Sequence, residues 1–526
     1  DGEEVIDVIA RHYTDALDAV PDDADTGEIT TLLIETLIRA AERATRTGAP
    51  KRAMTSYAAA GDLLERAGDP LRAAELWLEA GLPGLLSGDY ATVSALALRA
   101  RETFLAHGDT ARAARALVGH GRAVGSSGRF AESRRLYKEA LDELGPGDSP
   151  ERLNALIQLS SNIVISGGDD GTDYSAESLR LAHALAVDDR TYARLLGSRG
   201  LYYDTYGDRR LAAMYLHESA RLAELCGGSD ILIQALGNLT NVLNVDRPSE
   251  AIEPAERALA IAERIGDRTT GGLLLTNMAY SYLAIGDWDA ADRILVLPTD
   301  ADPFVDRDYL AVTFALFHSL RGDTALARSV LDGAVGQLDS EDPQDRAGIA
   351  TALAFAAFAD GDLPAALEHA QQSIAELANE GWLSFAGDDG RWAWPLAARV
   401  AHELGRDDVE ADLLALLEAE QRGTLAKMQL AEALLIRARL ADRRGEPDAV
   451  HLYERAVAAL RTDSTPYHLA HGLLDQAGFL LRRGAIDDGV SADELVDEAR
   501  TIAERLRCAP LQTRVAAVAA GPRVAS

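Results

Sequence analysis

Three asparagines have side chains that could bind the backbone of an extended peptide. Asn238 and Asn277 occupy similar positions in Gly237-Asn238-Leu239 and Thr276-Asn277-Met278, and Asn241 lies close to the first of them. A carboxamide both donates and accepts hydrogen bonds, so it can pair with the C=O and the N–H of a guest backbone. The other interpretation is that these amides satisfy neighbouring helix ends or simply face water.

A second candidate site combines tyrosines with arginines. Tyr202, Tyr203 and Tyr206 lie between Arg199 and Arg209. Aromatic faces beside guanidinium groups suit a planar or anionic ligand. Tyrosine near a helical turn is also common packing within a repeat protein, so a core role for these residues stays open.

A third candidate is the segment 381–395, which holds three of the five tryptophans, Trp382, Trp392 and Trp394. This segment interrupts the regular spacing described below. Insertions in repeat proteins often map to a binding face, although a tryptophan cluster can equally plug a gap where the stack bends.

Motifs for catalysis and for metal binding are missing from the sequence. A P-loop needs Gly-Lys followed by Ser or Thr, and none of the three lysines follows a glycine. His217-Glu218 and His402-Glu403 lack the second histidine of a zinc motif. A calcium loop starting at Asp169 would need a glutamate at its twelfth position, which is Arg180. We therefore expect no enzyme activity, no metal and no cofactor in this chain.

The composition narrows the class of partner. Acidic residues number 84 against 52 basic ones, giving a formal charge of −32 that should repel nucleic acid. Cys226 and Cys508 are too far apart in sequence to suggest a CxxC site, which favours a reducing cytoplasm. No run of apolar residues is long enough to predict a membrane helix. The chain begins at Asp1 without a methionine, so we expect it to be part of a longer protein.

The elements that must position these candidates follow a regular turn. A Gly-Asp-like turn recurs twelve times, at intervals of 36 to 44 residues and mostly near 40. The turn positions are Gly48, Gly88, Gly128, Gly168, Gly207, Asp246, Gly286, Gly322, Gly361, Gly405, Gly445 and Gly484. A fixed period of this length is typical of repeat architectures.

Each repeat is predicted to be a helix, a tight turn and a second helix. Between Thr269 and Ile294 the apolar residues recur at helical spacing, Gly286-Asp287 breaks the helix, and small alanines follow. Glycine permits the left-handed conformation at a helix end, and aspartate caps the next helix. The sequence therefore predicts an all-α, right-handed superhelical solenoid of about twelve helical hairpins, whose first helices line a concave face.

The predicted organisation has four parts. Residues 1–28 form an N-terminal helix and junction, 29–298 the first half of the repeats, and 299–508 the second half with the insertion at 381–395. Residues 509–526 form a C-terminal cap and tail. The shortened interval between Gly286 and Gly322 predicts a break in the stack.

The hairpins, with small residues inside the first helix, Tyr or Phe near the turn and Ala at the crossing, resemble tetratricopeptide repeats. The ends resemble the repeat arm of large actinobacterial signalling proteins, in which a P-loop ATPase and a nucleotide cyclase or DNA-binding module precede the arm. Residues 9–13, 40–44 and 48–50 resemble the junction after the ATPase, and 464–470 and 499–506 resemble the final unit.

This resemblance implies a non-catalytic sensor arm for protein–protein interaction. Such an arm would bind a peptide, a protein or a small effector in its groove and control an attached ATPase or cyclase in signal transduction. It carries over no catalytic residue, because no catalytic module is present in this sequence. The alternative is a purely structural scaffold or oligomerisation module without a groove ligand.

Overall fold

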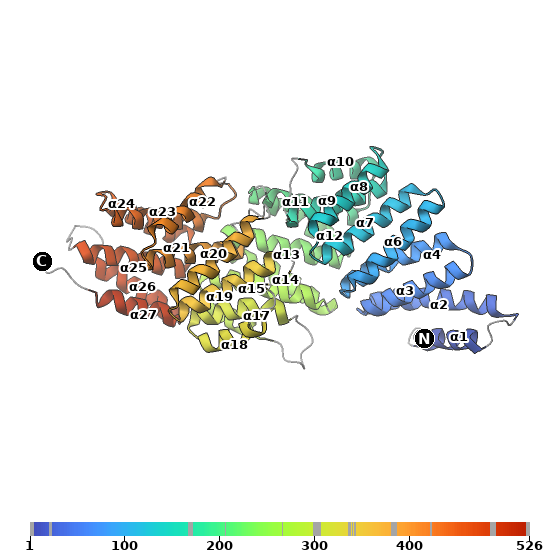
Figure 1. Ribbon diagram of the computed structural model, residues 1–526, viewed down its shortest axis with the longest axis horizontal. Coiled ribbons are helices and arrows are strands. Elements are labelled where there is room, and N and C mark those ends of the chain that lie inside the picture. Colours follow the sequence, from blue (N-terminus) through green and yellow to red (C-terminus); the bar gives the residue numbers. More distant parts are fainter. Residues whose placement is uncertain are drawn as a thin grey trace. The chain divides into compact units, whose positions relative to one another are not determined.

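The computed structural model describes residues 5–19, 24–166, 172–205, 207–265, 267–297, 307–334, 338, 340, 343–379, 387–420, 423–483 and 491–521. Regular structure in these residues is helical, and no strand occurs among them (Figure 1). The chain divides into two compact units, Asp1–Ser198 and Arg199–Ser526.

Unit 1 is a succession of antiparallel helices. They are α1 (Ile6–Ala19), α2 (Thr26–Arg46), α3 (Pro50–Arg66), α4 (Pro70–Glu79), α5 (Gly81–Leu86), α6 (Tyr90–Ala106), α7 (Thr110–Ser126), α8 (Phe130–Leu144), α9 (Pro150–Ser166) and α10 (Tyr174–Leu185). Helix α11 (Asp189–Thr205) crosses the division between the units.

Unit 2 continues the same pattern. Its first helices are α12 (Arg209–Leu225), α13 (Ser229–Asp246), α14 (Pro248–Ile265), α15 (Arg268–Ile285), α16 (Trp288–Ile294), α17 (Arg307–Arg321), α18 (Thr324–Ala334) and α19 (Pro343–Ala359). There follow α20 (Leu363–Asn379), α21 (Asp388–Glu403), α22 (Asp407–Ala419), α23 (Lys427–Arg443), α24 (Ala449–Asp463), α25 (Pro466–Arg483), α26 (Ala492–Arg505) and α27 (Ala509–Ala519).

The predicted turns form as expected. Nine of the twelve turn positions are glycines with positive φ; Asp246 ends α13, and Gly168 and Gly484 lie outside the described residues. Several aspartates that follow a turn or linker cap the next helix by accepting a backbone N–H, among them Asp69, Asp89, Asp109, Asp173, Asp188, Asp208, Asp267, Asp287 and Asp362. The predicted all-α architecture of successive helical hairpins is therefore confirmed.

Within each hairpin, close packing depends on small residues. In unit 1, a Cβ on Gly61 of α3 would lie 2.5 Å from the indole nitrogen of Trp77, which is 1% exposed. In unit 2, Ala291 at the predicted tight crossing is completely buried. The indole of Trp77 thus occupies the space that a larger residue at position 61 would need.

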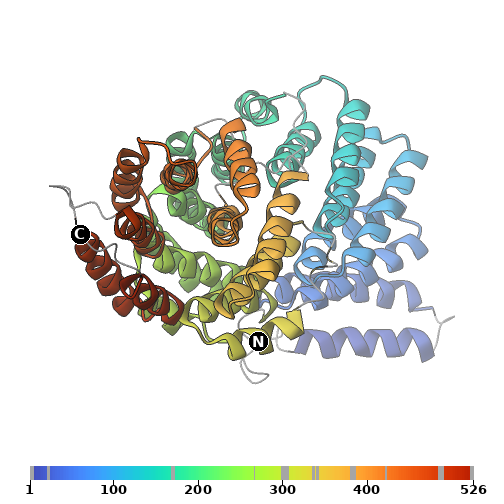
Figure 2. The same ribbon diagram turned by 60° about the vertical axis from the view of Figure 1, so that its left-hand side comes forward.

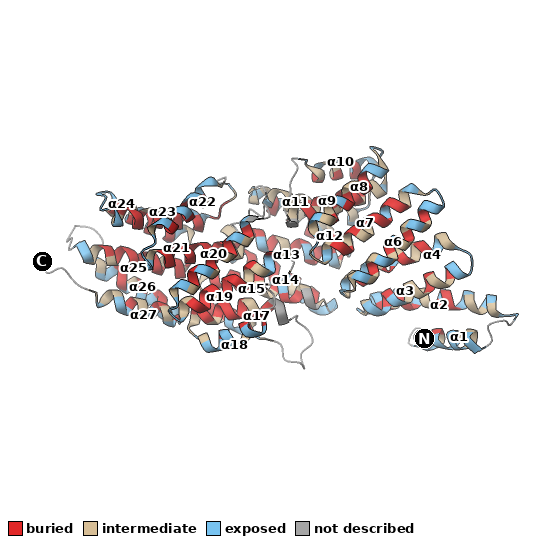
Figure 3. Ribbon diagram, viewed as in Figure 1, coloured by how far each residue is buried: buried red, intermediate tan, exposed pale blue. Residues whose placement is uncertain are grey.

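In unit 2 the first helices of the hairpins are buried almost all round. Twelve consecutive residues of α21, Gly390–Ala401, are buried, and α19, α23 and α25 are similarly covered (Figure 3). The second helices α22, α24 and α26 bury only one face. An all-round buried helix must be surrounded by other helices, which in this unit come from distant parts of the sequence.

Unit 2 folds back on itself, so that its last helices lie against its first ones. The orange and red helices lie beside the green and yellow ones in Figure 2. The guanidinium of Arg209 donates to the carbonyls of Thr424 (3.1 Å) and Leu425 (2.7 Å) and pairs with Asp246. Arg321 donates to the carbonyl of Leu506 at 2.6 Å. These contacts join hairpins that are several repeats apart.

Among the described residues, no helix is both long and apolar enough to cross a lipid bilayer.

Candidate functional site

Two of the predicted asparagines lie on an accessible stripe of α13. Asn241 and Gln234 are exposed and Asn238 is half-buried, whereas most of the helix is buried. Spacings of four and three residues place the three side chains on one face. No described contact inside the molecule uses these three amides, so their donors and acceptors are free for another molecule. We call Gln234, Asn238 and Asn241 the amide stripe.

Asn277 lies in a different environment from the amide stripe. Its side chain is 5% exposed, and its backbone carbonyl accepts a hydrogen bond from Nδ2 of Asn244 at 3.3 Å. Arg391 of α21 in turn donates to the carbonyl of Asn244 at 2.8 Å. Asn238 and Asn277, one repeat apart, thus differ in burial: Asn277 lies against Asn244 of α13, which α21 also contacts.

The predicted tyrosine–arginine group does come together. The guanidinium of Arg199 lies 4.7 Å from the ring centre of Tyr202 and 4.5 Å from that of Tyr203, and it donates to the Tyr203 hydroxyl at 2.9 Å. Tyr203 also stacks on Tyr215. These contacts are the ones expected if the tyrosines and Arg199 pack against one another inside the protein. Tyr206 lies outside the described residues.

The structure places Trp392 and Trp394 in the core. They are 2% and 0% exposed, and Nε1 of Trp394 donates to the carbonyl of Leu413 at 3.0 Å. Trp392 contacts the rings of Tyr280, Phe355 and Tyr467. The sequence left open whether these tryptophans form a binding face or fill a gap in the stack of helices. Their burial matches the second interpretation. Trp382 lies outside the described residues.

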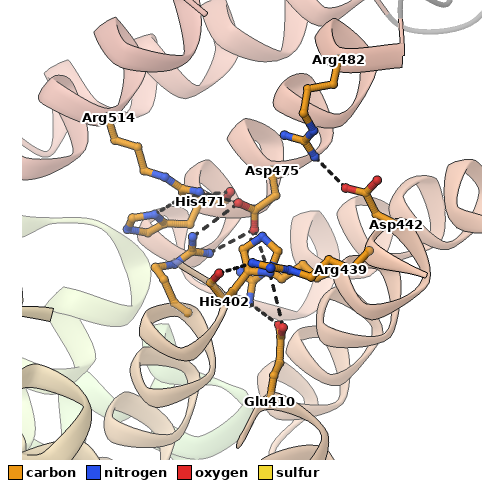
Figure 4. Close-up of polar contacts among 10 residues, drawn as sticks. His402, Glu410, Arg439, Asp442, His471, Asp475, Arg482 and Arg514 are labelled. Atoms are coloured by element: carbon orange, nitrogen blue, oxygen red, sulfur yellow. Dashed lines mark hydrogen bonds and ion pairs between the residues drawn. The ribbon is translucent and has the colours of Figure 1, made fainter. Parts of the chain in front are cut away.

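A buried charged cluster in unit 2 was not predicted from the sequence (Figure 4). Its centre is Asp475 of α25, whose Oδ2 accepts from Nη2 of Arg439 at 2.6 Å and from Arg399 at 3.3 Å. Arg514 pairs with the other carboxylate oxygen. The side chains of Asp475, Arg439 and Arg399 are 3%, 0% and 6% exposed.

The cluster joins four successive inner helices. Arg399 belongs to α21, Arg439 to α23, Asp475 to α25 and Arg514 to α27. Their spacings in sequence follow the repeat, since each lies 36 to 40 residues from the next. A charged residue recurring at the repeat interval on first helices is therefore the signal that could have revealed this cluster.

Opposing charges set the pKa values of the cluster. Burial alone would raise the pKa of Asp475, but Arg439, Arg399 and Arg514 together hold it well below its usual range. Burial lowers the pKa of Arg399 to about 10, with Arg514 adding to the shift and Asp475 opposing it. Burial raises the pKa of Glu432 to about 7, although Arg439 and Arg399 oppose the rise. The aspartate is thus the firmly ionised member and Glu432 the titratable one.

A small cavity adjoins the cluster, lined in part by Arg399, Glu432, His468 and His471. Its volume of about 10 Å³ is no more than one water molecule needs. Burial, with Arg399 beside both rings, lowers the pKa of His468 to about 3 and that of His471 well below its usual range. The cavity is too small for a substrate, and the ion pairs of the cluster link helices α21, α23, α25 and α27.

Metal binding has no candidate in the part of the chain that the structure describes. No group of three or more His, Cys, Asp or Glu side chains is arranged there to hold an ion. The described residues thus include an internal charged cluster around Asp475 and an accessible amide stripe on α13.

Comparison with known proteins leaves the family open. No protein-family model and no curated protein sequence matches the chain. A Rap protein complexed with competence and sporulation factor is similar in structure, with 11% identity and a TM-score of 0.43, covering 77% of this chain and 99% of that one. The Cut9–Hcn1 hetero-tetramer of APC/C is similar with 13% identity and a TM-score of 0.38, covering 89% and 96%. At these values neither likeness carries an argument about function.

Proposed function

We propose that this chain is a non-catalytic interaction arm that binds an extended peptide segment of a partner through the amide stripe of α13. The observation that carries the proposal is the set of three accessible amides, Gln234, Asn238 and Asn241, on one face of a first helix. Because each amide can both donate and accept, the stripe can pair with a peptide backbone whatever its sequence.

The arm is further proposed to belong to a larger signalling regulator, and its occupancy to control an attached ATPase or cyclase. This part rests on the resemblance of residues 9–13 and 499–506 to the ends of such arms. The reading frame upstream of the codon for Asp1 tests it. A P-loop with a cyclase or DNA-binding module would support the proposal, and a start codon directly before Asp1 would overturn it.

Peptide binding is tested with the full chain and a phage library of random dodecapeptides. Peptides selected on the wild-type protein are synthesised, and their dissociation constants are measured by fluorescence anisotropy. We expect the double variant Asn238→Ala/Asn241→Ala to bind at least tenfold more weakly, since two side chains that contact the backbone are lost. Gln371→Ala, which removes an exposed amide from α20, serves as the matched control.

Two results would overturn the proposal. One is a library that yields no peptide above background, and the other is equal affinity for the double variant and the wild type. Light scattering then tests the structural alternative, because a scaffold would show concentration-dependent association with an empty amide stripe.

A further inference from the structure

Two buried polar atoms of unit 2 have no hydrogen-bond partner in the part of the chain that the structure describes. They are Oε1 of Glu432 in α23 and Nε2 of His471 in α25. The two residues are 2% and 3% exposed, so both atoms are shielded from bulk solvent. A buried polar atom without a partner is unfavourable, and in folded proteins an internal water molecule commonly supplies the missing hydrogen bond.

The contacts of His471 determine which of its ring nitrogens carries the proton. Nδ1 pairs with the guanidinium of Arg514 (Figure 4). A guanidinium can only donate, so Nδ1 is the acceptor in this pair. Burial and the charges of Arg399 and Arg514 lower the pKa of His471 well below its usual range, which keeps the ring neutral. The single ring proton therefore lies on Nε2, and that nitrogen is a donor that lacks an acceptor among the described residues.

Both residues line the small cavity beside the charged cluster. Its volume of about 10 Å³ is at the lower limit for one water molecule and is too small for a larger guest. The lining residues thus bring one unsatisfied acceptor, Oε1 of Glu432, and one unsatisfied donor, the Nε2–H of His471. A water molecule can accept from the donor and donate to the acceptor at the same time.

The charges around the cavity favour a neutral guest. Arg399 lines the cavity together with Glu432. A cation would therefore meet a guanidinium, and an anion would meet a carboxyl group whose pKa of about 7 leaves it partly ionised at neutral pH. Moving an ion from solvent into a buried position is also unfavourable in itself. Size and charge therefore both select water over a monatomic ion.

We propose that this cavity binds one structural water molecule, which accepts a hydrogen bond from the Nε2–H of His471 and donates one to Oε1 of Glu432. The water bridges α23 and α25, the same two first helices that the Arg439–Asp475 ion pair joins. It gives a partner to each of the two buried atoms. The inference goes beyond the proposed function and does not depend on a peptide partner.

The first test is a crystal structure of the full chain at a resolution that shows ordered water. We expect one density peak within hydrogen-bonding distance, about 2.7–3.2 Å, of both Oε1 of Glu432 and Nε2 of His471. A cavity without a peak would overturn the inference. A direct hydrogen bond between the two side chains would also overturn it, because no water would then be needed.

Nuclear magnetic resonance of protein that contains isotope-labelled histidine gives a second measurement, in solution. The ring resonances of His471 are identified by their absence from the spectrum of His471→Gln. We expect the ring proton on Nε2, with a nuclear Overhauser peak between this proton and water. A proton on Nδ1, or an Nε2 proton without such a peak, would contradict the assignment.

Two substitutions at position 432 separate the hydrogen bond from packing. Glu432→Gln keeps an oxygen that can accept from the water, so the water should remain. Glu432→Met has a similar shape without a comparable acceptor, so the density peak and the Overhauser peak should both be lost. Glu418→Met, which removes an exposed carboxylate, is the matched control and should keep both. Water retained in Glu432→Met, or lost in Glu432→Gln, would overturn the inference. If Glu432→Met does not fold, the wild-type measurements still decide.

Discussion

Among the described residues, unit 2 contains a fully buried ion pair between neighbouring hairpins, whereas the comparable pairs of unit 1 are exposed to solvent. In unit 1 the pairs Arg99–Asp62 and Arg115–Glu79 link hairpins at the surface, with side chains 41% to 56% exposed. In unit 2 the pair Arg439–Asp475 spans a similar interval in sequence but is 0% and 3% exposed. The same repeat spacing thus produces a solvated contact in one unit and a buried one in the other.

The difference teaches that the repeat spacing determines which charged residues pair. The burial of the pair, which follows from the way unit 2 folds back on itself, determines how much the pair contributes to stability. An exposed pair contributes roughly 0–1 kcal/mol, because water and salt screen it. Losing one partner of a buried pair costs about 3–5 kcal/mol, because the other charge is left without compensation. Unit 2 should therefore be sensitive to a single charge change in its buried cluster, whereas the exposed pairs of either unit should tolerate one.

The largest expected effect comes from Asp475→Asn. This change leaves Arg399, Arg439 and Arg514 in the core without their shared counter-ion, and we expect unit 2 to lose about 3–5 kcal/mol of unfolding free energy. Urea denaturation followed by tryptophan fluorescence measures it, since Trp392 and Trp394 lie in the same unit.

Asp442→Asn is the matched control for this experiment. Asp442 pairs with Arg482, whose side chain is 59% exposed, and its loss should cost at most about 1 kcal/mol. Equal losses of unfolding free energy in Asp475→Asn and Asp442→Asn would show that burial does not change the contribution of an ion pair. That result would contradict the comparison of the two units.

A smaller loss of stability is expected from substitutions at Gly207, a turn residue that contacts Gly423 and Thr424. In Gly207→Ala the new Cβ would lie 2.6 Å from the carbonyl oxygen of Gly423, at a φ of +79°. In Gly361→Ala the φ is +81° but no atom lies within 4 Å. We expect both to cost about 1–2 kcal/mol for the backbone, and Gly207→Ala a further 1–3 kcal/mol, roughly, for the clash.

Thermal denaturation of the two glycine variants gives the comparison directly. A Gly207→Ala protein as stable as Gly361→Ala would show that the contact between residue 207 and residues 423–424 does not hold in solution.

The smallest effect concerns the titratable member of the cluster, Glu432. Its folded pKa of about 7 lies above the ordinary value of 4.5, so its contribution to stability is complete below pH 4.5 and is lost as the pH rises through 7. Glu432→Gln removes this titration. The stability of the wild type relative to the variant should therefore fall by on the order of 1–3 kcal/mol between pH 5 and pH 8.

Chemical denaturation at the two pH values measures this difference. The low pKa values of His468 and His471 affect both proteins alike and cancel in the comparison. Glu418→Gln, which removes an exposed carboxylate, controls for the general effect of charge. A difference between wild type and Glu432→Gln that stays constant from pH 5 to pH 8 would contradict the assignment.

The sequence was sufficient to predict the helices, turns and caps, but it was insufficient to predict the contacts between distant helices. A positive φ at a turn and an aspartate cap depend only on neighbouring residues. The roles of Gly286 at the turn and of Asp287 as a helix cap could therefore be predicted directly from the sequence. Asn277 is buried against Asn244, whose carbonyl accepts from Arg391, more than a hundred residues later in the chain. No local pattern encodes that contact, which is why the two residues were predicted to be equivalent.

The Asp475 cluster was missed for a related reason. Charged residues are so frequent in this chain that a pair close in sequence carries little information. The informative pattern is an arginine or aspartate repeated at the hairpin interval among apolar neighbours, as at positions 399, 439, 475 and 514. The amide stripe was partly found, because Asn238 and Asn241 were predicted and Gln234 was not.

Native-state hydrogen exchange tests most directly whether the buried charges stabilise unit 2 against local opening. The exchange is followed by mass spectrometry at increasing denaturant concentrations. Peptides from α21, α23 and α25 should exchange only through the complete unfolding of unit 2, whereas peptides from α7 and α9 of unit 1 should open at a lower free energy. Equal opening free energies for the two sets, or faster exchange in α21, α23 and α25, would contradict the account.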